Sequence, residues 1–136
     1  MNTIIAKSKY LRGTAQKARR VADVVRGMNA DYALDLLKYM PHRAAALIYK
    51  TLRSAVANAE NNNGLDRKNL VIQKLLINDA PMFKRGRAES KGRYRQILKR
   101  NSHVEIHLAE KEVTAKAPKV ETKETKVSKP KSPKKK

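Results

Sequence analysis

Apolar residues recur with the period of a helix in three stretches of the chain. The first follows Thr14, a predicted N-cap, and ends at Gly27, which suits the residue after a helix. The second covers about residues 29–38, and the third opens on Pro41 as its first helical residue and ends at the run 61–64. The positions predicted to be buried are Ala15, Ala18, Val21, Ala22, Val25, Ala33, Leu34, Leu37, Ala44, Ala45, Ile48, Leu52, Ala55, Val56 and Ala59.

Three further stretches have the composition or the alternation of strands. Residues 3–11 predict a first strand and residues 70–77 a second one. The third alternates with period two, which places Val104, Ile106 and Leu108 on one face and His103, Glu105 and His107 on the other. The predicted fold class is therefore α+β, with three helices packed on a small antiparallel three-stranded sheet that carries a long extended β-hairpin arm.

The arm is predicted at residues 81–100, between the second and third strands. This segment holds eight Lys or Arg residues against the single acid Glu89, and it has little apolar material for a core of its own. Gly86 and Gly92 are expected to bracket its turn. Legs of about nine residues at ~3.3 Å per residue would reach roughly 30 Å from the body. Structureless loops of this length are uncommon in compact domains unless they are functional or disordered, so we interpret the segment as an arm that binds a polyanion.

Charge is concentrated in two extensions from a modestly basic body. The formal net charge is +20 and the isoelectric point about 10.5, which makes nucleic acid the first partner to consider, and no membrane partner is expected. Residues 113–136 contain nine lysines, two glutamates and three prolines without apolar periodicity, and they are predicted to be a disordered Lys/Pro-rich basic tail behind a folded domain of residues 1–112. With five Tyr and one Phe, the chain is expected to use phosphate and groove contacts, not a platform for stacked bases.

The chain offers no convincing catalytic or metal-binding constellation. It has no cysteine, which excludes a disulfide framework and a thiolate metal site. His103 and His107 would lie roughly 13 Å apart along a strand, too far to share a metal unaided. Asp31 and Asp35, one helical turn apart, fit a helix start and a solvated surface better than a catalytic pair. We therefore expect no enzyme, no metal and no cofactor, and the sequence predicts neither a signal peptide nor a transmembrane run.

A second basic surface is predicted around the first helix. It would comprise Arg12, Lys17, Arg19, Arg20 and Arg26. For each of these residues a solvated or packing role is as good an explanation as contact with RNA, because long cationic side chains also cover apolar surface.

Three segments carry a resemblance to a known family. They are GTAQKARRVADVVRG at residues 13–27, TLRSAVANAENNNG at 51–64 and KGRYRQILKRNSH at 91–103. In this order, and across residues 4–112, the chain resembles the large-subunit ribosomal protein twenty-two family of bacterial type. The resemblance implies a cytoplasmic protein of the large ribosomal subunit, with a small α+β body near the exit of the nascent-peptide tunnel and a β-hairpin that reaches inward to line the tunnel wall. It also implies partners in large-subunit ribosomal RNA (rRNA), neighbouring ribosomal proteins and the passing nascent peptide, and a part in subunit assembly.

Together with the charge pattern, the resemblance assigns candidate rRNA-binding residues. Those of the hairpin are Lys84, Arg85, Arg87, Lys91, Gly92, Arg93, Arg95, Lys99 and Arg100, and those of the body are Arg12, Lys17, Arg19 and Arg20. The tunnel-facing tip would be Ala88, Glu89 and Ser90, where many members of the family read Pro-Arg-Ala.

The alternative from another class is an architectural DNA-binding protein with β-arms that wrap the minor groove. Such arms usually carry an apolar or proline wedge that unstacks a base step, and Ala88-Glu89-Ser90 offers none. A small nuclease, the third reading, lacks a site.

Overall fold

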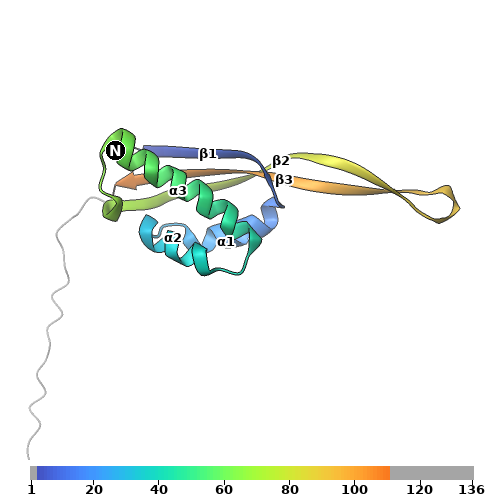
Figure 1. The fold of residues 1–136 in the computed structure, drawn as a ribbon, viewed down its shortest axis with the longest axis horizontal. Coiled ribbons are helices and arrows are strands. Elements are labelled where there is room, and N and C mark those ends of the chain that lie inside the picture. Colours follow the sequence, from blue (N-terminus) through green and yellow to red (C-terminus); the bar gives the residue numbers. More distant parts are fainter. Residues whose placement is uncertain (1–2, 111–136) are drawn as a thin grey trace, which may run out of the picture.

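The computed structural model describes residues 3–110 and confirms the α+β architecture (Figure 1). In chain order its elements are β1 (Thr3–Arg12), α1 (Ala15–Val25), α2 (Ala30–Tyr39), α3 (Arg43–Asn63), a 3₁₀ turn (Arg67–Asn69), β2 (Leu70–Ala88), a second 3₁₀ turn (Ser90–Gly92) and β3 (Tyr94–Glu110). The predicted tail at 113–136 and the domain boundary at residue 112 lie outside the described residues.

The sheet is antiparallel, with β3 between β1 and β2, and the helices pack on one of its faces (Figure 1). The period-two alternation of β3 correctly predicted its two faces, since Val104, Ile106 and Leu108 are buried against the helices while the residues between them are half-buried on the outer face. The fully buried Ile48 and Leu52 of α3 lie in the same core. One layer of helices on one layer of sheet thus buries the apolar stripes that the sequence shows.

Strand β1 departs from regular pairing close to its end. Its register to β3 shifts between Ser8 and Leu11, and Tyr10 adopts a positive φ of 56° there. The backbone N–H of Tyr10 donates to Nδ1 of His103 at 3.0 Å, and the two rings meet edge to face at 4.8 Å between centroids. A bulge of this kind re-aims the chain, and here it directs β1 into the turn that precedes α1.

The helix ends follow the predicted signals, with two corrections. Thr14 occupies the N-cap position of α1, but its hydroxyl makes no capping hydrogen bond within the described residues. Asn29 caps α2 by accepting a hydrogen bond from the backbone N–H of Asp31, and Gly64 closes α3 in the left-handed conformation. The prediction that Pro41 opens α3 was wrong, because His42 is the N-cap and Arg43 the first helical residue. Pro41 lies in the connection between the helices.

Beyond the body, β2 and β3 continue together as the predicted hairpin arm (Figure 1). Pairing persists from Phe83 opposite Lys99 to Ala88 opposite Tyr94, and every residue from 81 to 100 is exposed. The expectation that Gly86 and Gly92 bracket the turn was half right. Gly92 lies in the turn with φ of 68°, whereas Gly86 is inside β2 opposite Gln96.

Candidate nucleic-acid interface

The register of the arm sorts its cations onto the two faces of a two-stranded ribbon. Residues that are directly opposite in an antiparallel pair point to the same side, so each cross-strand pair can be assigned to one face. One face carries four cations among six residues, and the other carries one. The first, the cationic face, consists of Phe83, Arg85, Arg87, Arg95, Ile97 and Lys99, and the second, the small-residue face, of Lys84, Gly86, Ala88, Tyr94, Gln96 and Leu98.

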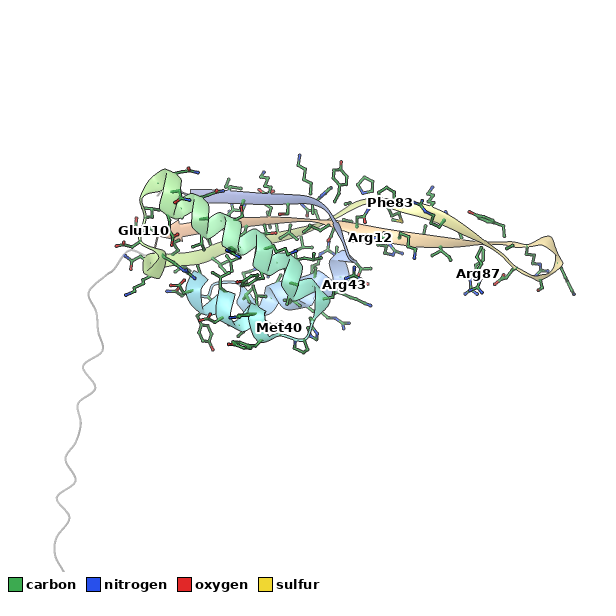
Figure 2. The ribbon with its side chains drawn as sticks, viewed as in Figure 1. Arg12, Met40, Arg43, Phe83, Arg87 and Glu110 are labelled. Carbon is green, nitrogen blue, oxygen red and sulfur yellow. The ribbon has the colours of Figure 1, made fainter. Side chains whose placement is uncertain are left out.

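The cationic face places like charges against each other. Arg87 is directly opposite Arg95, an arrangement that destabilises a β-ribbon. Arg85 lies over the ring of Phe83, with 5.5 Å from its guanidinium carbon to the ring centroid. The side chains of the arm, Phe83 and Arg87 among them, project away from the ribbon, and none of these residues is buried by the body (Figure 2). Phosphate groups along the arm would relieve this repulsion, as expected of a surface that binds a polyanion.

The tip is a tight polar turn in which the acid is paired within the arm itself. The N–H of Glu89 donates to the carbonyl of Arg93 at 2.8 Å, and Lys91 and Gly92 both take positive φ values, of 59° and 68°. The carboxylate of Glu89 accepts from the guanidinium of Arg95 at 3.1 Å. The unusual acid in the tip is therefore held by an arginine two residues beyond the turn. No apolar wedge of the DNA-bending kind projects from this turn.

At the root of the arm, cations from distant parts of the chain meet around one pocket of about 390 Å³. Its charged lining consists of Arg12, Lys17, Arg43, Lys99 and Arg100, and we call it the root pocket. In the described part of the chain no acidic side chain lines it. Two predicted body residues and two predicted hairpin residues thus meet in one site, although about eighty residues of sequence separate them. Five cations without an acid in the described lining give the pocket a charge that would suit more than one phosphate group.

Arg43 is the contributor that sequence reasoning missed. It stands at the first position of α3, next to the root pocket, and is labelled beside Arg12 in Figure 2. Only the packing of α3 across β1 brings it there, so its local sequence carried no signal. Thr14 also lines the root pocket, and its buried Oγ1 has no hydrogen-bond partner among residues 3–110.

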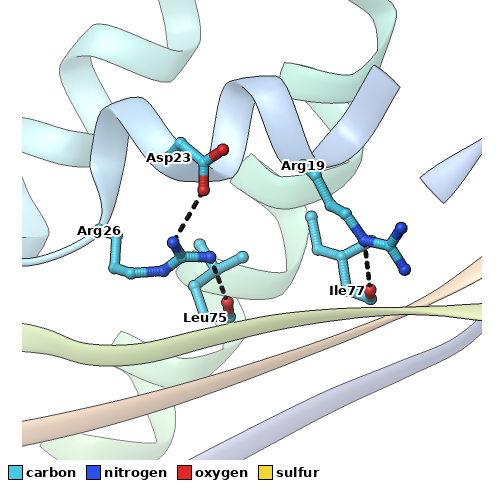
Figure 3. A network of polar contacts seen from close by, with 5 residues as sticks. All are labelled: Arg19, Asp23, Arg26, Leu75 and Ile77. Atoms are coloured by element: carbon cyan, nitrogen blue, oxygen red, sulfur yellow. Dashed lines mark hydrogen bonds and ion pairs between the residues drawn. The ribbon is translucent and has the colours of Figure 1, made fainter. Parts of the chain in front are cut away.

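Arg19 in α1 and Arg26, the residue at its C-cap, brace the helix against the sheet (Figure 3). Nε of Arg19 donates to the carbonyl of Ile77 at 3.1 Å, and Arg26 donates to the carbonyl of Leu75 at 3.1 Å while it pairs with Asp23 at 2.8 Å. Arg19 was assigned to RNA, and the structure gives it a structural contact in addition to any such role. Arg20 is exposed on α1 and is not part of the root pocket lining.

Both histidines weighed as candidate ligands have structural partners, since His103 accepts the bond from Tyr10 described above. His107 lies 2.9 Å from Glu105, whose carboxylate also pairs with Lys7 at 2.9 Å. The hydrogen bond from Lys7 is the main reason that the pKa of Glu105 falls below its ordinary value; burial opposes this shift, and the hydrogen bond with His107 adds to it. Within residues 3–110, no group of three or more His, Cys, Asp or Glu side chains is arranged to hold a metal ion. The described helices include none that is long and apolar enough to cross a membrane.

One comparison with known proteins bears on this arrangement. A family model described as Ribosomal protein L22p/L17e matches residues 6–109, which include the body, the root pocket and the whole arm. The match covers most of the chain and agrees with the resemblance carried by residues 13–27, 51–64 and 91–103. The chain therefore belongs to the Ribosomal protein L22p/L17e family and is a structural, rRNA-binding protein of the large ribosomal subunit.

Proposed function

We propose that the body docks on large-subunit rRNA near the exit of the nascent-peptide tunnel and that the arm reaches inward along the tunnel wall. The observation that carries the proposal is the fully exposed, cation-rich hairpin that leaves the body at a basic pocket. An arm that contributes nothing to the core and repels itself has no role in folding. It gains a role once RNA surrounds it.

Two regions of the protein bind phosphate groups of the RNA. The root pocket holds the sugar-phosphate backbone at the point where the arm enters the RNA, and the cationic face of the arm follows the backbone further inward. Arg87 and Arg95 act there as a pair, because phosphate between them removes their mutual repulsion. Lys84, Lys91 and Arg93 add contacts around the ribbon and its turn.

Assembly follows from the same geometry. A β-hairpin that becomes surrounded by RNA has to be in place before the RNA closes around it, so the chain binds early and helps the large subunit to assemble. The body remains at the surface beside neighbouring ribosomal proteins, and the turn at Ala88, Glu89 and Ser90 faces the passing nascent peptide. The proposed role is structural, without catalysis.

Replacement of root pocket cations tests the docking part of the proposal. The variant Arg12→Ala/Arg43→Ala removes two cations from the root pocket, and Arg53→Ala/Lys50→Ala removes two exposed cations of α3 that do not line it. We expect the first variant to lower the slope of log affinity against log salt by roughly 1.4–1.8 for large-subunit rRNA, and the control to change it far less. Equal slopes for the two variants would show that the root pocket does not hold the RNA backbone.

A further inference from the structure

An aromatic ring lies directly on a glycine in the outer half of the arm. A methyl group added at Gly86 would come within 1.9 Å of Cε2 and 2.5 Å of the hydroxyl oxygen of Tyr94. The two residues are diagonal neighbours on the small-residue face, since Gly86 is opposite Gln96 and Ala88 is opposite Tyr94. Any other residue at position 86 would displace the ring, so the glycine is what allows the ring to lie there.

The ring is nevertheless largely open to solvent. Tyr94 is 70% exposed, the highest value among the large apolar and aromatic residues of the arm. Its directly opposite neighbour Ala88 is too small to cover it. Arg93 and Arg95 flank it in sequence, and Lys84 stands on the same face beyond Gly86. The arm thus presents the exposed ring of Tyr94 among neighbouring cationic side chains.

We propose that Tyr94, held in place by Gly86, is a stacking platform for an unpaired base of the large-subunit rRNA. The inference rests on the proposed function and adds a base contact to an arm otherwise described by phosphate contacts. Stacking on an aromatic side chain accepts any base, because every base has a π-face, and neighbouring cations hold the phosphates on either side of it. A ring that already packs over Gly86 has less conformational freedom to lose when a base stacks on it.

The competing explanation is that the ring only shields the backbone at Gly86 and thereby stabilises the hairpin. That role needs apolar cover but no aromatic face, so leucine should fill it nearly as well. Stacking requires a planar π-system, so phenylalanine should fill it and leucine should not. The two substitutions therefore separate the explanations.

Affinity for RNA gives the first test. With the full-length chain and a single-stranded RNA oligonucleotide, Tyr94→Leu should weaken binding on the order of 10-fold, whereas Tyr94→Phe should stay within about twofold of the original chain. Both variants should bind inorganic polyphosphate, which has no bases, as the original chain does. The matched control is Tyr39→Leu, an exposed tyrosine of α2 on the body, which should leave RNA binding unchanged. Equal RNA affinities for Tyr94→Leu and Tyr94→Phe would overturn the proposal.

Fluorescence gives a direct signal of stacking. The chain has no tryptophan, so Tyr94→Trp introduces a single indole at the platform. Its emission should be quenched by the RNA oligonucleotide and not by an abasic oligonucleotide of the same length or by polyphosphate. The same quenching by all three polyanions would mean that only charge is sensed, which would overturn the proposal.

A photocrosslinking amino acid at position 94 extends the test to the assembled subunit. Crosslinks to rRNA support the platform, and crosslinks to the nascent peptide alone contradict it while leaving the proposed tunnel location intact. Failure of the original chain to place its arm in the RNA would instead count against the proposed function, so the two ideas fail by different results.

Discussion

Removal of the arm should leave the fold of the body intact and abolish its deep contact with RNA. The register shows where to cut: Phe83 and Lys99 are directly opposite, so residues 84–98 can be replaced by Asn-Gly, whose readiness for positive φ suits a two-residue hairpin turn. Every residue removed is exposed, and none belongs to the hydrophobic core.

The size of each effect follows from the structure. Exposed residues away from special features change stability by about 0.5 kcal/mol or less. Replacing 15 residues by two shortens the connection by roughly three factors of two. The smaller entropy cost of closing the shorter connection favours folding by up to about 2 kcal/mol. The free energy of unfolding should therefore stay unchanged or rise by no more than about 2 kcal/mol. The deletion removes six cations, namely Lys84, Arg85, Arg87, Lys91, Arg93 and Arg95. If each of them releases a counterion, the salt slope of rRNA binding should fall by roughly 4 to 5.

Urea denaturation followed by circular dichroism measures the first quantity, and filter binding to large-subunit rRNA over a series of salt concentrations measures the second. A control that keeps the arm and replaces Glu89 with Gln should retain nearly the full slope. A loss of more than about 1 kcal/mol in the unfolding free energy would show that the arm supports the core. A salt slope that the deletion leaves unchanged would refute the assignment of these cations to RNA.

Two further predictions concern the body. Gly64→Ala should lower the free energy of unfolding by about 1 kcal/mol, because φ at this helix end is 61° and nothing lies within 4 Å of the added methyl group. Gly64→Asn should lower it less, since asparagine tolerates a positive φ better than alanine. Equal urea midpoints for all three chains would contradict this. The pair of Glu105 with Lys7 should stabilise the fold fully above pH 4.5, the ordinary pKa of the carboxyl, and lose this contribution as the pH falls through the lower folded-state pKa. Thermal melts from pH 3 to 7 should show Glu105→Gln less stable than the original chain at neutral pH and converging with it in acid; a constant difference would refute the linkage.

Periodicity in the sequence was enough to predict the sheet and the three helices. The alternation around Ile106 and the helical repeat around Ile48 each encode one buried face, and burial of such faces against one another leaves few architectures. The arm was predictable for a related reason. Residues 81–100 contain too many like charges to be part of a core, while strands on both sides require the segment to return.

Contacts that depend on tertiary packing were beyond the reach of sequence patterns. Arg43 reaches the root pocket only because α3 crosses β1, and Arg19 was assigned to RNA without any sign of its bond to the carbonyl of Ile77. Gly86 resembled a turn residue, since local sequence cannot distinguish a glycine needed for its φ from one needed for the space above it. The scarcity of aromatic residues predicted no stacking platform, and the proposal for Tyr94 departs from that expectation because the space above Gly86 can be seen only in the folded chain.

The location of the arm in the RNA can be measured most directly by site-directed hydroxyl radical cleavage. The chain has no cysteine, so Ser90→Cys in the tip and Ser54→Cys on the exposed side of α3 each provide one attachment point for an iron chelate. Large subunits assembled with either variant should show rRNA cleavage at two separate sets of nucleotides. The set from position 90 should lie along the tunnel wall, and the set from position 54 at the subunit surface near the tunnel exit. Coincident cleavage sets, or none from position 90 in subunits that contain the protein, would contradict an arm that reaches inward along the RNA.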